Sequence, residues 1–134
     1  QGIRVRASIA IMQENRILLT PHHKLDGSII WYMPGGGVNF GETLRQAAER
    51  ELLEETGYIG IAQDFIHLHE TIEPDKPYHG IGVTFSGYII GGELRAEDHH
   101  VYGLKIARWM TKDDLIGLKY DRPEIINPLL GITS

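Results

Sequence analysis

The stretch Gly35–Tyr58, GGGVNFGETLRQAAERELLEETGY, decides the fold because it predicts a long helix between two glycine-containing loops. Thr43 and Gln46 have the spacing of a capping box, in which two side chains satisfy the free backbone N–H groups of the first turn. Gly57 stands where a left-handed residue commonly ends a helix. We therefore expect a helix over Thr43–Thr56, with the clearest chemical pattern of the chain on its surface.

Three carboxylates share one face of this helix near its C-terminal end. Glu51, Glu54 and Glu55 lie within roughly 100° of arc at 3.6 residues per turn. Like charges at these spacings repel by about 0.2–0.5 kcal/mol per pair, and the negative end of the helix dipole disfavours them further. A bound divalent cation would explain the arrangement. Mg²⁺ or Mn²⁺ fits, because the ligands are hard oxygens and the chain has no Cys.

Each feature also has an ordinary interpretation. A glutamate-rich helix end is commonly a solvated surface, and Arg50 alone is compatible with a surface cation. The three glycines at 35–37 are compatible with a flexible loop, and they lack the GK[ST] of a P-loop. The occurrence of all these features in one register favours a metal site.

This register resembles the Nudix box, which fixes glycines, an arginine and glutamates over 23 residues. The matching residues are Gly36, Glu42, Arg50, Glu51, Leu52, Glu54, Glu55 and Gly57. Tyr58 departs, as an aromatic residue where an aliphatic one is commoner. The resemblance implies a MutT-like Nudix hydrolase with an α/β fold: an α/β/α sandwich around a mixed sheet, with the box as a loop–helix–loop.

The same resemblance implies roles for the residues of the box. Metal ligands are implied at the Gly35 carbonyl and at Glu51, Glu54 and Glu55, with Mg²⁺ as the cofactor and Mn²⁺ as a substitute. Arg50 is expected to orient these carboxylates by charge-assisted hydrogen bonds, and Glu42 to lie near the metal-bound water. The expected catalytic residues of the box are therefore Glu54, Glu51, Arg50 and Glu42.

The rest of the chain predicts a mixed α/β domain, and we expect one domain over residues 1–134. Strands are expected at Ile3–Met12, Arg16–Thr20, Ile29–Met33, Ile59–His69, Ile81–Ile90 and Leu104–Met110. Glu14-Asn15 indicates a turn between the first two. Thr111 is expected to cap a short helix through Leu118, and Pro123 to open a last helix.

Composition limits the classes of partner. The net charge is −5 and no block of like charge suggests a nucleic-acid-binding arm, so we expect a small-molecule nucleotide substrate and no nucleic-acid polymer. An anionic ligand of an acidic chain then needs close neutralisation, which metal ions provide. No apolar run approaches the ~18 residues that span a bilayer, so no membrane is expected. The absence of Cys is compatible with a cytoplasmic location, and a homodimer is compatible with the sequence.

Several residues outside the helix are weaker candidates. Family members often add an acid from a loop before a late strand, which points to Glu97 or Asp98, less to Glu93, with His99 or His100 as a base or its partner. An exposed turn is the alternative. Arg4 and Arg6 project from one strand face and are candidate substrate ligands, with surface charge as the alternative. Trp31, Tyr32 and Phe40 are candidates to stack on a base, or ordinary core residues. Because Trp31 and Tyr32 point to opposite strand faces, at most one is expected at the ligand.

The resemblance implies Mg²⁺-dependent hydrolysis of the diphosphate bond in a nucleoside diphosphate linked to another moiety. Pro74 lies 16 residues beyond Tyr58, and in the family a proline near that distance is associated with ADP-ribose hydrolysis. This slightly favours an ADP-ribose-like nucleotide sugar over an (oxidised) nucleoside triphosphate. A non-catalytic nucleotide sensor is disfavoured because all four box glutamates are present. The isomerase chemistry of the same fold is disfavoured because its familiar form needs a Cys.

Overall fold

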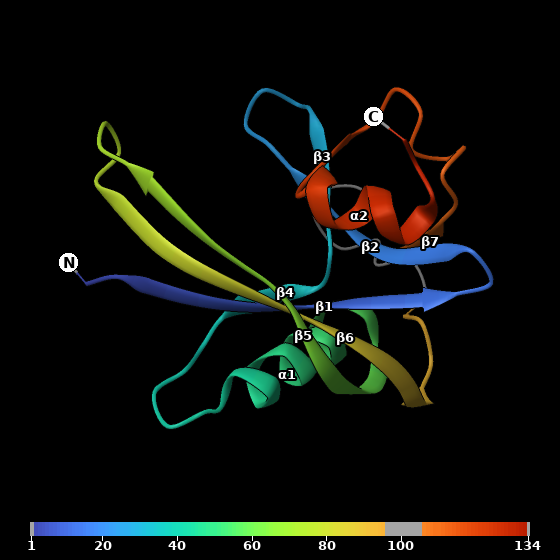
Figure 1. The fold of residues 1–134 in the computed structure, drawn as a ribbon, viewed down its shortest axis with the longest axis horizontal. Coiled ribbons are helices and arrows are strands. Elements are labelled where there is room, and N and C mark those ends of the chain that lie inside the picture. The colour runs from blue at the N-terminus through green and yellow to red at the C-terminus, as the bar shows by residue number, and fades with distance from the viewer. Residues whose placement is uncertain (1, 96–105, 134) are drawn as a thin grey trace.

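The computed structural model describes residues 2–95 and 106–133. Its elements, in chain order, are β1 (Arg4–Gln13), β2 (Arg16–His23), β3 (Ile29–Tyr32), β4 (Gly35–Gly37), α1 (Leu44–Thr56), β5 (Tyr58–Glu73), β6 (Tyr78–Gly92), β7 (Arg108–Met110), β8 (Lys119–Tyr120) and α2 (Pro123–Leu130). Figure 1 shows α1 and α2 on opposite sides of a curled sheet. The α/β sandwich that the sequence predicted is therefore confirmed.

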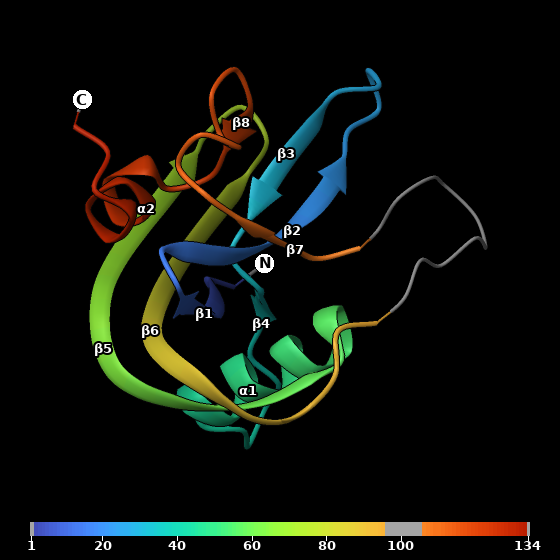
Figure 2. The ribbon, with the colours of Figure 1, turned by 90° about the vertical axis from the view of Figure 1, so that its right-hand side faces the viewer.

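The sheet is mixed, with the strand order β5-β6-β1-β2-β3-β8, and β4 and β7 joining β1 and β2. Strand β1 pairs in parallel with β6 and antiparallel with β4, so three segments far apart in the sequence meet along it. Strands β5 and β6 form a long antiparallel hairpin that bends around the molecule, as Figure 2 shows. Residues of this hairpin line one cavity together with residues of β2 and β3.

Two hydrophobic cores lie on the two faces of the sheet, and alternate residues of β1 supply them. Ile9 and Ile11 pack with Leu52 of α1 in the first core. Ala10 points the other way and packs with Ile126 of α2 in the second. The period of two along a strand thus lets one strand anchor both helices.

The central helix has the ends that its sequence predicted. Thr43 accepts a hydrogen bond from the N–H of Gln46, whose side chain accepts one from the N–H of Thr43. Gly57 ends the helix with φ of 91°, and its N–H donates to the carbonyl of Leu53. These local patterns placed the helix because each depends only on residues within one turn.

Two expectations were wrong. The segment 111–118 forms a run of turns instead of a helix, with backbone N–H groups of Leu115 and Ile116 bonding three residues back. Thr111 makes a reciprocal capping pair with Asp114, but Gly117 at φ of 79° stops the segment before an α-helical turn is complete. The glycines at 35–37 are strand β4 rather than a loop.

The strand expectations differ mainly in length. Strands β5 and β6 are longer than expected, because the turn between them takes only the four residues 74–77. The expected strand Leu104–Met110 is β7 over its last three residues, and its first two lie outside the described residues. Within the described part of the chain, no helix is long and apolar enough to cross a membrane.

The core beneath α1 predicts a sharp difference between two neighbouring leucines. Leu52 is 0% exposed and Leu53 is 46% exposed. Leu52→Ala should lower the free energy of unfolding by about 2–5 kcal/mol, because it leaves a cavity. Leu53→Ala should lower it by less than about 1 kcal/mol. Urea denaturation of both variants measures the contrast, and equal losses would contradict this placement of α1.

Candidate active site

The carboxylates of α1 are organised by one guanidinium group. Arg50 donates from Nε to Glu42 at 2.7 Å and from Nη2 to the other oxygen of Glu42 at 3.0 Å. Its Nη1 donates to both Glu51 and Glu54 at 3.0 Å. Its Nη2 also donates to the carbonyl of Gly37 at 2.9 Å. One cation therefore ties three carboxylates to the strand β4 that precedes the helix.

This arrangement shifts the protonation of the groups involved. Hydrogen bonds from Arg50 and from the N–H of Asn39 lower the pKa of Glu42. Hydrogen bonds to Glu42, and then to Glu51, raise the pKa of Arg50 against the effect of its burial. Both residues are therefore charged at neutral pH, where they form an ion pair.

Glu55 lies deeper than the other carboxylates and is not bound by Arg50. Its Oε1 accepts a hydrogen bond from the N–H of Gly35 at 2.9 Å. Burial raises the pKa of Glu55 to about 7, and the charge of Glu51 adds to this, while the Gly35 hydrogen bond opposes it. The carboxylate thus lacks a full counter-charge.

Two close approaches explain why glycines stand opposite these side chains. A Cβ at Gly36 would overlap the carboxylate of Glu51, and a Cβ at Gly35 would overlap Ser8 and the carbonyl of Ala7 on β1. Any larger residue would therefore push β4 away from α1 or from β1. The glycines are needed for packing as well as for an open backbone.

The donor set fits a hard divalent cation. Glu51, Glu54 and Glu55 offer only oxygen atoms, and no cation of the described residues forms an ion pair with Glu55, whose pKa is raised mainly by burial. Among the described residues, no three acidic or histidine side chains converge closely enough to hold a metal ion. Arg50 holds Glu51 and Glu54, and Glu54 is 57% exposed, so its side chain is free to turn.

The C-terminal carbonyls of α1 have a separate partner. Arg95, which follows β6, donates to the carbonyl of Glu54 at 2.7 Å and to that of Leu53 at 3.2 Å. A cation at this position opposes the negative end of the helix dipole. It therefore offsets part of the cost of placing three glutamates there.

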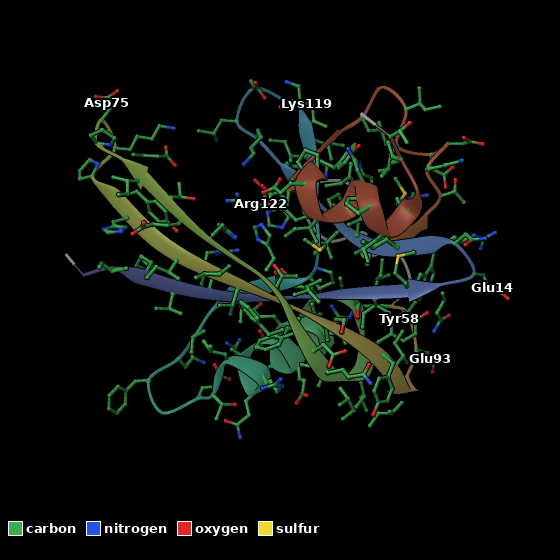
Figure 3. All side chains as sticks on the ribbon, in the orientation of Figure 1. Glu14, Tyr58, Asp75, Glu93, Lys119 and Arg122 are labelled. Carbon is green, nitrogen blue, oxygen red and sulfur yellow. The ribbon has the colours of Figure 1, made fainter. Side chains whose placement is uncertain are left out.

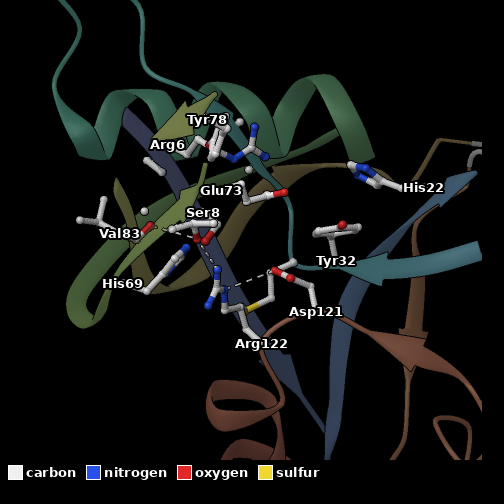
Figure 4. A pocket seen from close by; sticks show the side chains of 16 residues that line it. Arg6, Ser8, His22, Tyr32, His69, Glu73, Tyr78, Val83, Asp121 and Arg122 are labelled. Carbon is white, nitrogen blue, oxygen red and sulfur yellow. Dashed lines mark hydrogen bonds and ion pairs between the residues drawn. The ribbon is translucent and has the colours of Figure 1, made fainter. Parts of the chain in front are cut away.

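A cavity of about 390 Å³ adjoins this site. Gly35 and Gly36 form one side of it and connect it to the carboxylates of α1. Figure 4 shows its other walls, and the labelled side chains that face it are Arg6, Ser8, His22, Tyr32, His69, Glu73, Tyr78, Val83, Asp121 and Arg122. Its volume is in the range of pockets that bind small molecules.

The structure places the expected substrate residues in different surroundings. Arg6 lines the cavity, whereas Arg4 is exposed and does not. Trp31 is 9% exposed and packs in the core beneath α2, which corrects its expected place at the ligand. Phe40 is fully exposed in the loop before α1 and does not line the cavity.

Tyr32 lies on the strand face opposite to Trp31 and lines the cavity. Its ring centroid is 4.2 Å from that of His22. The candidate catalytic acids Glu97 and Asp98, with His99 and His100, lie outside the described residues.

Several other cavity residues were not identified from the sequence. His69 of β5, Tyr78 of β6 and the pair Asp121-Arg122 come from distant segments that only the bend of the hairpin brings together. The alternation along β5, where His69, Thr71 and Glu73 share the cavity face, could have grouped three of its members. Nothing in the sequence could have placed Asp121 opposite them.

Known proteins resemble the chain over most of its length. The family description of the NUDIX domain matches residues 2–129. The chain is 33% identical over 116 residues to the ADP-ribose pyrophosphatase of Methanocaldococcus jannaschii, covering 87% of this chain and 66%, just under two thirds, of that protein. It is 29% identical over 115 residues to Phosphatase NudJ of Escherichia coli K12, covering 84% and 71%.

Solved structures share the fold. A NUDIX hydrolase from Nitrosomonas europaea matches with a TM-score of 0.76 and 22% identity, covering 94% of this chain and 85% of that one. A MutT NUDIX hydrolase from Burkholderia pseudomallei matches with a TM-score of 0.73 and 22% identity over the whole of both chains. The curled sheet with two helices is common to this chain and both of these structures.

The raised pKa of Glu55 predicts a pH dependence of stability in the metal-free protein. The carboxyl is neutral in the folded protein up to pH of about 7, but ionises in the unfolded chain near its ordinary value. Its contribution to stability is therefore complete below pH of about 4.5 and is lost as the pH rises to about 7. Glu55→Gln keeps an acceptor for the N–H of Gly35 and removes this loss. In EDTA, the variant should gain about 1–3 kcal/mol over the wild type between pH 5 and pH 8.

Urea denaturation of both proteins across that range measures the difference. His22 and His69 have lowered pKa values, so their titration changes the stability with pH in the opposite direction. Both proteins contain these histidines, and the difference between the two curves therefore removes their contribution. If the difference in the free energy of unfolding stays constant over this range, Glu55 titrates near the ordinary pKa of an exposed carboxylate, and the prediction is wrong.

Proposed function

The chain belongs to the Nudix family of hydrolases, which act on phosphoric anhydride bonds, and from this premise we propose that it hydrolyses the diphosphate bond of a nucleoside diphosphate linked to another moiety. The observation that carries the proposal is the row of carboxylates on α1, fixed by Arg50 beside a cavity large enough for a nucleotide-sized group. Within this class we favour an ADP-ribose-like nucleotide sugar.

The box residues divide into two kinds. The proposed catalytic set is Glu51, Glu54, Arg50 and Glu42, with Glu97 in the segment outside the described residues. Glu51, Glu54, Glu55 and the Gly35 carbonyl would hold Mg²⁺, or Mn²⁺ in its place. When bound, the ion would neutralise phosphate oxygens and lower the pKa of a bound water. Arg50 positions Glu51 and Glu54 by its charge-assisted hydrogen bonds and carries no proton itself in the reaction.

The backbone at β4 has a separate part in binding. Gly35 and Gly36 border both the carboxylates and the cavity, so a diphosphate lying over them would be held between the two. Their lack of side chains leaves room for that approach. Arg6, on β1 next to this strand, would reach a phosphate or ribose oxygen from the cavity side.

Two observations support the nucleotide-sugar preference. The Methanocaldococcus jannaschii relative bears the name ADP-ribose pyrophosphatase. Pro74 lies in the turn that ends the β5–β6 hairpin, whose tip Figure 3 marks with Asp75. The residues on either side of that turn, Glu73 and Tyr78, both line the cavity. The turn therefore determines where one wall of the cavity stands, which is a reason for a proline there to affect the choice of substrate.

We predict that the activity depends strictly on a divalent metal and on Glu54. EDTA should abolish turnover, and Mg²⁺ or Mn²⁺ should restore it. Glu54→Gln should lower kcat by about two or more orders of magnitude at saturating Mg²⁺, because it removes a ligand charge and keeps the shape of the side chain. Thermal denaturation should show that the variant remains folded.

Glu14→Gln is the matched control, since Glu14 stands in the β1–β2 turn far from α1 (Figure 3). It should leave kcat within about twofold of the wild type. Full turnover in EDTA, or a Glu54→Gln enzyme as fast as the Glu14→Gln enzyme, would remove the carboxylate row from the mechanism.

Substrate preference is tested by comparing kcat/KM for ADP-ribose with that for dGTP and 8-oxo-dGTP under the same Mg²⁺ concentration. ADP-ribose should be preferred, with AMP and ribose 5-phosphate as the products. A preference of about tenfold or more for a triphosphate, equal to about 1.4 kcal/mol in transition-state binding, would make the protein a nucleoside triphosphate pyrophosphohydrolase and leave the class of reaction unchanged.

A further inference from the structure

Arg122 enters the cavity from the start of α2 in an unusual backbone conformation. Its φ and ψ are 55° and 57°, in the left-handed region that residues with a Cβ seldom adopt. It occupies the N-cap position of α2, yet its side chain makes no capping hydrogen bond. Its carbonyl accepts the first hydrogen bonds of the helix, from Ile125 and Ile126, while its side chain turns to the cavity. Figure 3 places Arg122 between α2 and the β5–β6 hairpin.

Among the described residues, the guanidinium has only long contacts. Its Nη2 donates to Thr71 Oγ1 at 3.3 Å and its Nη1 to Glu124 at 3.4 Å. The carboxylate of Asp121 is 3.7 Å from Nε, beyond hydrogen-bond distance. The Nε atom is buried and donates to no described residue, and Nδ1 of neighbouring His69 is also buried without such a partner. A guanidinium carries five N–H donors, and the two hydrogen bonds above use one from each Nη atom, so the Nη atoms keep donors for an oxygen in the cavity.

The cavity around this group is close to neutral. The positive charges of Arg6 and Arg122 face the negative charges of Glu73 and Asp121 across the same space. Burial lowers the pKa of both His22 and His69, and the charges of Lys24 and Arg122 respectively add to this, so the two imidazoles are uncharged at neutral pH. A second anion would gain no net attraction here, whereas a neutral group with donors and acceptors would satisfy both signs of charge.

We propose that Asp121 and Arg122 form a specificity subsite for a neutral part of the substrate that presents an O–H or N–H donor next to an oxygen acceptor. Asp121 accepts from the donor, and the guanidinium of Arg122 donates to the oxygen. Two parts of a nucleotide sugar have this chemistry: the vicinal hydroxyls of the distal sugar and the amide-like edge of a nucleobase. The subsite rests on the proposed hydrolase function, since it lies in the same cavity, but it is separate from the carboxylates that carry the reaction.

The test variants are Arg122→Asn and Asp121→Asn. Asn tolerates the left-handed backbone better than most residues, so Arg122→Asn removes the guanidinium with little change in the chain path. Arg108→Gln is the control, because Arg108 is exposed on β7 and does not line the cavity. Thermal denaturation of the full chain should show all three proteins folded.

The subsite predicts an effect on binding rather than on turnover. Each of the two subsite variants should raise KM for ADP-ribose by about tenfold or more, with kcat within about threefold of the wild type. Arg108→Gln should change neither. A loss confined to kcat, or losses in the control as large as those in the variants, would overturn the proposal.

Two substrate series show which part of the substrate the subsite reads. ADP-ribose, ADP-glucose and ADP share a base and differ in the distal group, whereas ADP-glucose, GDP-glucose and UDP-glucose share a sugar and differ in the base. If the subsite holds the sugar, Arg122→Asn should make the kcat/KM values of ADP-ribose, ADP-glucose and ADP similar to one another, and should leave the differences within the second series unchanged. If it holds the base, the variant should make the kcat/KM values of the second series similar to one another and leave the differences within the first series unchanged. If the variant lowers kcat/KM for every substrate of both series by the same factor, the subsite proposal is wrong.

A binding measurement separates this proposal from the proposed function. The rise in melting temperature caused by ADP-ribose in EDTA should be present in the wild type and lost in Arg122→Asn. If the wild type binds ADP-ribose in this way and hydrolyses none of the compounds, the hydrolase proposal fails and the subsite stands. If the shift is the same in both proteins, or is absent from the wild type, the subsite is wrong whatever the activity.

Discussion

The hydrogen bonds of Arg50 are the interaction on which the arrangement of the site depends. Glu51, Glu54 and Glu55, near the C-terminal end of α1, would repel each other and the negative end of the helix dipole. The rigid donors of Arg50 hold Glu51 and Glu54 together with Glu42 from the loop before the helix. Because Arg50 also donates to the carbonyl of Gly37, the same group fixes β4 against the helix. A lysine could neutralise the charge but could not make these five directed contacts at once.

Glu55 is the carboxyl group of this site that the described residues leave without an ion-pair partner. It receives one backbone hydrogen bond from Gly35 and no cation of the described chain contacts it. Its burial is permitted by the packing of β4 against β1, which needs glycine at both 35 and 36. The strand, the helix and the buried carboxylate are therefore mutually dependent: a side chain on β4 would displace Glu51, and a longer gap between β4 and α1 would let water reach Glu55.

The sequence predicted those parts of the structure that depend on neighbours along the chain. Thr43, Gln46 and Gly57 define α1 because caps act within one turn. Trp31 shows the limit of that reasoning. Strand alternation required Trp31 and Tyr32 to face opposite ways, but only the position of α2 on one side of the sheet decided that Trp31 is core and Tyr32 lines the cavity. The failure at 111–118 has the same origin, since a capping pair marks a helix start and does not supply the residues to continue it.

The division between local and distant residues also separates the chemistry from the choice of substrate. The groups that would hold the metal ion, and the Arg50 network that positions them, come from Gly35 to Glu55, a contiguous stretch whose register can be recognised without a structure. The groups that would recognise the rest of the molecule come from β1, β2, β3, the β5–β6 hairpin and the start of α2, and the bend of that hairpin sets their spacing (Figure 2). A change in the hairpin turn, or at Arg122, would move or remove a cavity wall and leave the Arg50 network in place. The same catalytic stretch is thus compatible with different substrates, and for this reason the box identifies the reaction while the cavity must identify the molecule.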